Sequence, residues 1–187
     1  MSTANASASK KRHALVTGGG TGIGIAIATA LVEQGMNVSV VGRRLDVLQN
    51  LANTNPEHIF AVQADVSNQA QVQQAFAEAK AHFGNIEILI NNAGSLINKP
   101  FTETTTADLA EMLESNVISH FKMIQHTLPL MHSGSHIVNV GSMGGFQGSV
   151  KFAGLSAYST SKAALCSFTE LFSEEYKEST IKMNEKH

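Results

Sequence analysis

A tyrosine and a lysine stand four positions apart, as Tyr158 and Lys162, in the segment SAYSTSKAA. In a helix, residues at i and i+4 share one face, with Cβ atoms roughly 5–6 Å apart. The ammonium group would favour the phenolate and lower the pKa of the phenol from its free value near ~10. Tyr158 could then donate a proton near neutral pH. An isolated pair of this kind is more often a surface tyrosine beside a solvated lysine, so the rest of the chain must decide.

The composition narrows the classes of protein to which the chain can belong. With 187 residues and 43% hydrophobic side chains, it can bury a sizeable core. We expect a flexible lead-in over residues 1–11 and one domain over residues 12–187. A net charge of −2 argues against a nucleic-acid or anionic-membrane surface as the partner.

Cysteine and histidine usage indicates no metal centre. Cys166 is the single cysteine, which excludes an intramolecular disulfide and fits a reducing cytoplasm. The eight histidines are scattered, and we interpret them as structural or solvent-exposed. We therefore predict that the protein has no metal-binding site.

Short apolar runs alternate with longer helical patterns along the chain. We expect strands at 13–17, 37–42, 58–64, 86–91 and 136–141. We expect helices at 22–34, 44–53, 68–83, 106–131 and 157–178. Strands that are apolar on both faces are typical of a parallel sheet covered by helices, so the pattern predicts a three-layer, doubly wound α/β fold of the Rossmann type. The apolar run 23–32 is too short to cross a bilayer and is predicted to be a buried helix.

A glycine-rich turn joins the first expected strand to the first expected helix. The sequence TGGGTGIG covers residues 17–24 and contains Gly18, Gly20, Thr21, Gly22, Ile23 and Gly24. Glycines at 18, 22 and 24 would allow a sharp turn and close approach to a pyrophosphate held at the helix N-terminus. A glycine turn alone is a weak signal, but its place between strand and helix favours dinucleotide binding over a mere tight turn.

Cofactor choice depends on the end of the second expected strand. An acidic residue there would bind the ribose 2′-hydroxyl of NAD, but this chain has Arg43 and Arg44. Guanidinium groups pair with a 2′-phosphate, so the sequence favours NADP(H), with NAD(H) less favoured. Two alternatives stay open, because the arginines could be an ordinary solvated helix start and Asp46 lies close enough to serve NAD.

Further polar residues follow the later strands, at the edge where open α/β sheets bind ligands. The segment NNAG ends at Gly94 and follows the fourth expected strand, and GSMGG begins at Gly141 after the fifth. Asn116 lies inside the long helix expected at 106–131, although asparagine is a poor helix former. Taken singly, Asn116 could be a tolerated polar position and Ser142 a loop hydroxyl.

Taken in order, these motifs resemble the short-chain dehydrogenase/reductase family in its broad NADP-using branch, over residues 12–184. Within the family they are similar to the 3-oxoacyl-[acyl-carrier-protein] reductases or to a general ketone reductase. The resemblance implies that Tyr158 is the proton donor or acceptor and that Ser142 orients the substrate carbonyl. It implies that Lys162 binds the nicotinamide ribose and lowers the pKa of the tyrosine. Asn116 would hold a water that continues a proton relay.

The resemblance also implies a cofactor cleft and an assembly. Asp65 and Val66 would flank the adenine, and Asn92, Ala93 and Gly94 would line the cleft. Helices 106–131 and 157–178 are the ones that pair in dimers of the family. They imply a homodimer, with a homotetramer as the alternative.

The family pattern continues past the Tyr–Lys helix into another strand, a substrate lid and a last strand. Here residues 181–187 begin that next strand and stop, so we expect the last strands of the family fold to be missing. Two functions follow. The first is an NADPH-dependent carbonyl reductase/alcohol dehydrogenase that transfers hydride between nicotinamide and a ketone, such as a 3-oxoacyl thioester. The alternative is a catalytically silent NADP-binding or association module.

Overall fold

The computed structural model describes residues 11–186, which form a six-stranded parallel sheet covered by helices. Its strands are β1 (His13–Thr17), β2 (Asn37–Gly42), β3 (Ile59–Gln63), β4 (Ile88–Asn91), β5 (His136–Val140) and β6 (Lys182–Lys186). The main helices are α1 (Gly22–Glu33), α2 (Leu45–Ala52), α3 (Gln69–Phe83), α4 (Thr106–Leu113), α5 (Ser119–Thr127) and α6 (Ser156–Glu175). Within this part of the chain, the three-layer α/β prediction is confirmed, and the expected lead-in 1–11 lies almost wholly outside it.

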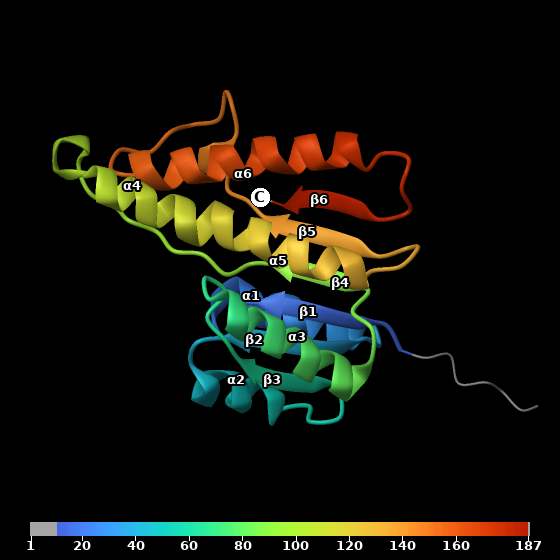
Figure 1. Cartoon of the computed structure of the whole chain (residues 1–187). Helices are drawn as coiled ribbons and strands as arrows, with labels where there is room; N and C mark the ends of the chain where they lie inside the picture. The colour runs from blue at the N-terminus through green and yellow to red at the C-terminus, as the bar shows by residue number, and fades with distance from the viewer. Residues whose placement is uncertain (1–10, 187) are drawn as a thin grey trace, which may run out of the picture.

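Two apolar cores lie on opposite faces of the sheet, as the alternation of side chains along a strand requires. In β1, Leu15 points into the core formed with α3, α5 and α6, whereas Ala14 and Val16 point into the core formed with α1 and α2. Each of these three residues is fully buried. Figure 1 shows the resulting layers, with α5 and α6 beside β4, β5 and β6.

The strand order is β3-β2-β1-β4-β5-β6, so the order reverses between β1 and β4. All strands run in parallel, and their arrowheads point to the same side in Figure 1. Ligands of open α/β sheets bind outside the carboxyl ends of the strands at such a reversal point. The loops after β1, β2, β4 and β5 therefore meet where a ligand is expected.

The prediction that residues 23–32 form a buried helix is wrong. The segment is helical, as α1, but only Gly24 and Ala28 are buried in it, whereas Ile23 is 63% exposed. The reason is that α1 covers one face of the sheet through its small residues, four positions apart, and so can lie close to the strands. Its remaining apolar side chains then face outward or sit at the margin of the core.

The single helix expected at 106–131 is divided. Between α4 and α5 lies one turn of π-helix, η2 (Glu114–Ile118), and a 3₁₀ turn, η3 (Leu128–Leu130), follows α5. A π-turn inserts an extra residue into the helix, and such turns are frequent at functional sites. Asn116 is the middle residue of this π-turn and is fully buried.

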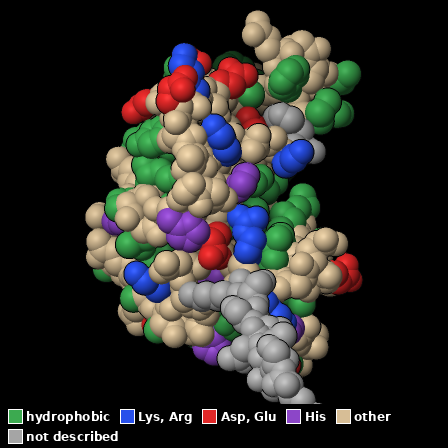
Figure 2. All heavy atoms as spheres, turned by 90° about the vertical axis from the view of Figure 1, so that its right-hand side faces the viewer, with side chains coloured by type: hydrophobic (Ala, Val, Ile, Leu, Met, Phe, Trp, Pro, Cys, Tyr) green, Lys and Arg blue, Asp and Glu red, His purple; other side chains and the backbone are tan. Residues whose placement is uncertain are grey.

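Figure 2 shows the face at the amino ends of the strands, opposite the loops described above. Acidic, basic and histidine side chains are interspersed on this face, and no patch there carries charge of one sign alone. Among residues 11–186, no helix is long and apolar enough to cross a bilayer. No group of three or more metal-ligating side chains occurs in the same range. The candidate site lies at the carboxyl ends of the strands, where the loops after β1, β2, β4 and β5 meet.

Candidate active site and cofactor cleft

The glycine turn after β1 has the geometry that close approach of a ligand requires. Gly18 and Gly22 have φ of 64° and 51°, in the left-handed region that favours glycine. A Cβ at Gly24 would collide with the carbonyl oxygen of Gly18, whereas a Cβ at Gly22 would meet nothing within 4 Å. Gly24 thus lets the helix pack against the turn, and Gly22 leaves open space above it.

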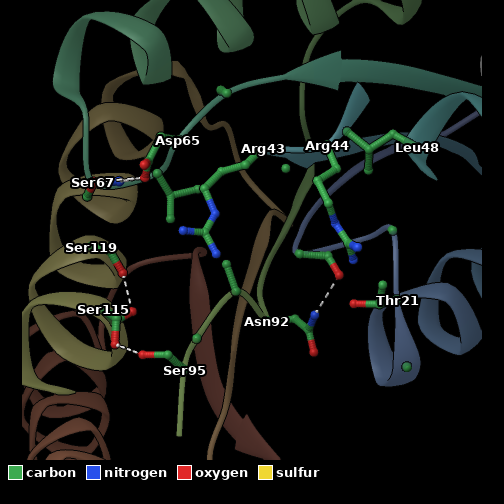
Figure 3. A pocket seen from close by; sticks show the side chains of 18 of the residues that line it. Thr21, Arg43, Arg44, Leu48, Asp65, Ser67, Asn92, Ser95, Ser115 and Ser119 are labelled. Carbon is green, nitrogen blue, oxygen red and sulfur yellow. Dashed lines mark hydrogen bonds between the residues drawn. The ribbon is translucent and has the colours of Figure 1, made fainter. Parts of the chain in front are cut away.

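The segment after β4 braces this turn. The main-chain N–H groups of Asn92 and Ala93 both donate to Thr17 Oγ1 at 3.0 Å. Asn92 Nδ2 donates to the carbonyls of Thr17 and Gly18 at 3.0 and 3.1 Å. Figure 3 shows Asn92 beneath the turn, near Thr21. The two segments are therefore held as one rigid edge.

The N-terminus of α1 fits an anionic group. Its N-cap residue, Thr21, makes no side-chain cap hydrogen bond. The N–H of Gly24 donates to the Thr21 carbonyl at 3.1 Å, which leaves the N–H groups of Gly22 and Ile23 for a ligand. The helix dipole also favours negative charge there. Together with the open space at Gly22, these features fit the pyrophosphate of a dinucleotide.

A cavity of about 850 Å³ opens along this edge. All but three of the predicted cofactor-binding residues line it, namely Gly18, Gly20, Thr21, Gly22, Ile23, Arg43, Arg44, Asp65, Val66, Asn92, Ala93 and Gly94. Of the other three, Gly24 lies beneath the turn, and Tyr158 and Lys162 belong to α6. The volume lies within the range of small-molecule and cofactor sites.

Both arginines after β2 extend into this cavity (Figure 3). Within residues 11–186, neither guanidinium pairs with an acidic side chain of the protein. Across the cavity, a main-chain hydrogen bond from Ser67 lowers the pKa of the Asp65 carboxyl below its ordinary value, and the charge of Arg43 adds to this effect. Both guanidinium groups therefore remain available to a ligand in the cavity, although the charge of Arg43 also acts on Asp65.

Asn116 connects three elements through its side chain. Its Oδ1 accepts the N–H of Ser95 at 2.9 Å and its Nδ2 donates to the Ser95 carbonyl at 3.0 Å. The same Nδ2 donates to Ser161 Oγ of α6 at 3.0 Å, and Ser115 Oγ donates to Oδ1 at 3.2 Å. An amide has two donors and two acceptor positions, so all four are used. Asn116 is therefore more than a polar residue that the helix tolerates, because its amide joins the loop after β4 to α6.

Lys162 reaches from α6 to the end of β5. Its side chain is buried, and Nζ donates to the carbonyl of Val140 at 2.7 Å. Burial lowers the pKa of Lys162 to about 8, although the negative charge of Glu185 opposes the shift. A Cβ at Gly94 would lie 2.7 Å from Asn116 Oδ1 and 3.9 Å from Lys162 Nζ. The end of the cofactor cavity thus meets the lysine and the asparagine.

Ser142 and Tyr158 lie on adjoining elements. Ser142 is the N-cap of a 3₁₀ turn, η4 (Met143–Gly145), and its Oγ accepts the N–H of Gly144 at 3.2 Å. A Cβ at Gly144 would lie 2.9 Å from Ser159 Oγ, so the turn rests on the first turn of α6 beside Tyr158. The segments that carry the four predicted catalytic residues, namely η2, the turn after β5 and α6, therefore meet at the carboxyl ends of β4 and β5.

Sequence reasoning missed several residues that support this site. Thr17, Ser95 and Ser161 supply hydrogen bonds within it, but an isolated hydroxyl or a main-chain group carries no pattern. His120, predicted as structural or exposed, is buried, and its Nε2 donates to the Ala93 carbonyl at 2.7 Å. Burial lowers the pKa of His120 to about 4, so it is neutral near pH 7. Its four-residue spacing from Asn116 was the available signal.

Comparison with known proteins identifies the family. The sequence model of the short chain dehydrogenases matches residues 12–186, nearly the whole chain. This chain belongs to the short-chain dehydrogenase family. Proteins of this family use a nicotinamide cofactor, NAD or NADP, which agrees with the fit of the cavity to a dinucleotide.

Curated relatives of this short-chain dehydrogenase include uncharacterized oxidoreductases of staphylococci. One from Staphylococcus aureus (strain MW2) is 33% identical over 173 residues, covering 91% of this chain and 74% of the relative. One from Staphylococcus epidermidis is 31% identical over 176 residues, covering 93% of this chain and 75% of the relative.

Solved structures of short-chain dehydrogenases have the same fold as this chain. A short-chain dehydrogenase from Streptomyces avermitilis has a TM-score of 0.84 at 32% identity, over 94% of this chain and 64% of that one. A short-chain dehydrogenase/reductase from Serratia marcescens BCRC 10948 has the same TM-score at 32% identity, over 93% and 72%. This chain therefore spans about three quarters of the curated relatives and about two thirds of the solved chains.

Proposed function

We propose that this protein is an NADP(H)-dependent carbonyl reductase/alcohol dehydrogenase with Tyr158 as the proton donor. The observation that carries the proposal is the position of Gly94, which lines the dinucleotide cavity and lies beside both Asn116 and Lys162. A cofactor in this cavity would therefore end near Lys162 of α6 and Asn116 of η2. Bound there, the nicotinamide supplies or accepts a hydride at the carbonyl carbon of the substrate.

The residues of the chain handle the proton and the charge. Reduction leaves an alkoxide that needs a proton, and Tyr158 delivers it. Ser142 Oγ already accepts the N–H of Gly144, so its own hydrogen is available to polarise the substrate oxygen. Lys162 holds the nicotinamide ribose and places positive charge near the phenol.

The proton relay continues through Asn116 in this proposal. Its side-chain amide is fully engaged with Ser95, Ser115 and Ser161. A relay water would therefore be held by the main-chain carbonyl of Asn116 in the π-turn, and the amide would hold that turn in place. The extra residue of a π-turn supports this division of roles, because it displaces carbonyls from the regular helical ladder.

The surroundings of the site favour an apolar ketone, such as a 3-oxoacyl thioester. Two segments border Ser142 and Tyr158, one after β4 and one between β5 and α6, and the main-chain N–H of Lys99 donates to the Gly154 carbonyl at 3.0 Å to join them. Their exposed side chains include large apolar ones, namely Leu96, Phe101, Met143, Phe146, Val150 and Phe152. The apolar part of a substrate could be buried against them.

Replacing the phenol tests the proposal. Tyr158→Phe should abolish NADPH-dependent reduction of a reactive ketone while leaving NADPH binding nearly intact, since only a transition-state contact is removed. Lys162→Ala should weaken both ketone reduction and NADPH binding. The control is Tyr176→Phe, because this second tyrosine stacks on Phe172 with ring centroids 4.2 Å apart, at the far end of α6. Full activity in Tyr158→Phe would refute the mechanism.

The same measurements decide the alternative, a catalytically silent NADP-binding module. The retained set of Asn116, Ser142, Tyr158 and Lys162 favours turnover, because a binding module needs no proton donor. NADPH binding without ketone reduction by the unsubstituted chain, across apolar ketones of different size, would support the silent module instead.

A further inference from the structure

Lys151 lies in the segment between Ser142 and α6, and its ammonium group is used entirely within that segment. Nζ donates to the carbonyls of Gly144 and Phe146 at 2.9 and 2.6 Å and to Ser149 Oγ at 3.0 Å. An ammonium group has three hydrogens, so these three acceptors match its full donor capacity. Although the side chain is exposed, it offers no further hydrogen to a substrate in this arrangement.

Ser149 reinforces the same arrangement. Its hydroxyl lies within hydrogen-bonding distance of the Phe146 carbonyl, at 2.8 Å, and of the Met143 carbonyl. Gly148, with φ of 80°, lets the chain reverse so that residues 149 and 151 return to the turn. The side chains of Ser149 and Lys151 thus add hydrogen bonds to the carbonyls of Met143, Gly144 and Phe146. The Met143 and Phe146 carbonyls also accept main-chain N–H groups, so the bond from Lys151 matters most at Gly144.

On its other side, the turn is wedged against α6. A Cβ at Gly145 would lie 2.6 Å from the main-chain carbon of Lys162, and one at Gly144 would lie 2.9 Å from Ser159 Oγ. The turn can therefore approach α6 this closely only with glycine at position 145, where a Cβ would meet main-chain atoms. Lys151 binds the outward carbonyl of Gly144, and the N–H of the same residue donates to Ser142 Oγ.

We propose that Lys151 is a positioning residue, which orients the hydroxyl of Ser142 by holding the η4 turn against α6. With Gly144 held at its carbonyl, its N–H keeps one acceptor position of Ser142 Oγ occupied. The hydrogen of that hydroxyl then points toward the substrate side rather than into the turn. The inference rests on the proposed function, because it assigns the role through Ser142.

The first test needs neither cofactor nor turnover. Amide hydrogen exchange is measured in Lys151→Met, in Lys151→Arg and in Lys99→Met. Lys99 is the matched control, because it lies on the adjoining segment and its ammonium pairs with Asp108 at 2.7 Å. We expect exchange at Gly144, Gly145 and Phe146 to accelerate at least tenfold in Lys151→Met, to stay near wild type in Lys151→Arg, and to be unchanged in Lys99→Met. Unchanged exchange in Lys151→Met would overturn the proposal.

The second test separates positioning from general loosening of the fold. With a ketone substrate, Lys151→Met should lower kcat at least tenfold and leave the KM for NADPH unchanged. In a Ser142→Ala background, the same substitution should have almost no further effect, because residues that act as a unit are not additive. Additive losses would contradict the role through Ser142. If the unsubstituted chain reduces no ketone, the proposed function fails, and the exchange experiment alone decides whether Lys151 holds the turn.

Discussion

Lys162 donates a hydrogen bond from Nζ to the carbonyl of Val140 at 2.7 Å, which ties the middle of α6 to the last residue of β5, two positions before Ser142. The ammonium is therefore positioned by a main-chain carbonyl of the sheet. It lies beside Gly94, which lines the cavity, and in the proposed function it also holds the nicotinamide ribose.

Cofactor affinity should fall as pH rises through about 8, because burial lowers the pKa of Lys162 to about 8 and the lysine is charged only below that value. We expect a roughly tenfold loss of NADPH affinity between pH 7 and 9.5, the size of one charge-assisted hydrogen bond. Fluorescence titration at each pH measures it. Lys162→Ala should bind weakly at every pH, and an equally steep loss in that variant would assign the titration to another group.

The lowered pKa of Lys162 should also make the free energy of unfolding depend on pH. Its pKa in the folded state lies below that of the unfolded chain, so the unfolded state binds more protons between about pH 8 and 10. The free energy of unfolding should gain a positive slope with pH in that window from this group. Urea unfolding of Lys162→Ala should show a smaller slope than the wild type.

NADPH should bind at least tenfold more tightly than NADH, a difference of about 1.4 kcal/mol, because Arg43 and Arg44 can pair with the 2′-phosphate. Replacing both arginines by alanine should weaken NADPH binding and leave NADH binding unchanged. Arg12→Ala is the control, since the Arg12 guanidinium donates to the Gly134 carbonyl at the other end of the sheet. Equal affinities in the wild type, or tighter binding of NADH, would refute the NADP preference.

Alanine substitutions at Gly22 and Gly35 can distinguish the effect of backbone strain from the effect of a lost ligand contact. Gly22 and Gly35 have φ of 51° and 81°, and a Cβ at either would meet nothing within 4 Å. Each alanine substitution should therefore cost about 1 kcal/mol of stability for its left-handed backbone. Only Gly22 lines the cavity, so only Gly22→Ala should weaken NADPH binding, at least tenfold. Calorimetry of both variants, with and without NADPH, distinguishes the two effects, and equal binding losses would contradict the assignment of the pyrophosphate to this turn.

The chain should form a homodimer through α6 and the helical segment 106–131, which runs from α4 to η3. The rings of Phe121 in α5 and Phe168 in α6 lie with their centroids 5.2 Å apart. Exposed apolar side chains occur on the same helical segments, namely Ile118 at the end of η2, Phe121 in α5 and Leu171 in α6. Leu171→Asp should shift the mass toward monomer, whereas Leu45→Asp, at an exposed leucine of α2, should not. Light scattering at micromolar concentration measures both. A monomeric wild type would contradict the prediction.

The sequence by itself determined the features that depend on local backbone chemistry. Five strands and the glycine turn were predicted within one or two residues, because strand periodicity and the need for positive φ at Gly18 are properties of short segments. The segment beginning at residue 181 was expected to start a strand, and β6 covers Lys182–Lys186. The places of Arg43 and Asn92 at strand ends followed from the same pattern.

Only the tertiary structure decided which groups meet. The outward exposure of Ile23 on α1, the π-turn at Asn116, and the engagement of Lys151 by the Gly144 carbonyl all depend on how elements distant in sequence pack together. The partner of Lys162 is a main-chain carbonyl, which every residue possesses and no sequence pattern marks. Local propensity sets where helices and strands form, whereas burial and hydrogen bonding between them decide which side chains become a site, because those interactions exist only once the sheet and its covering helices are assembled.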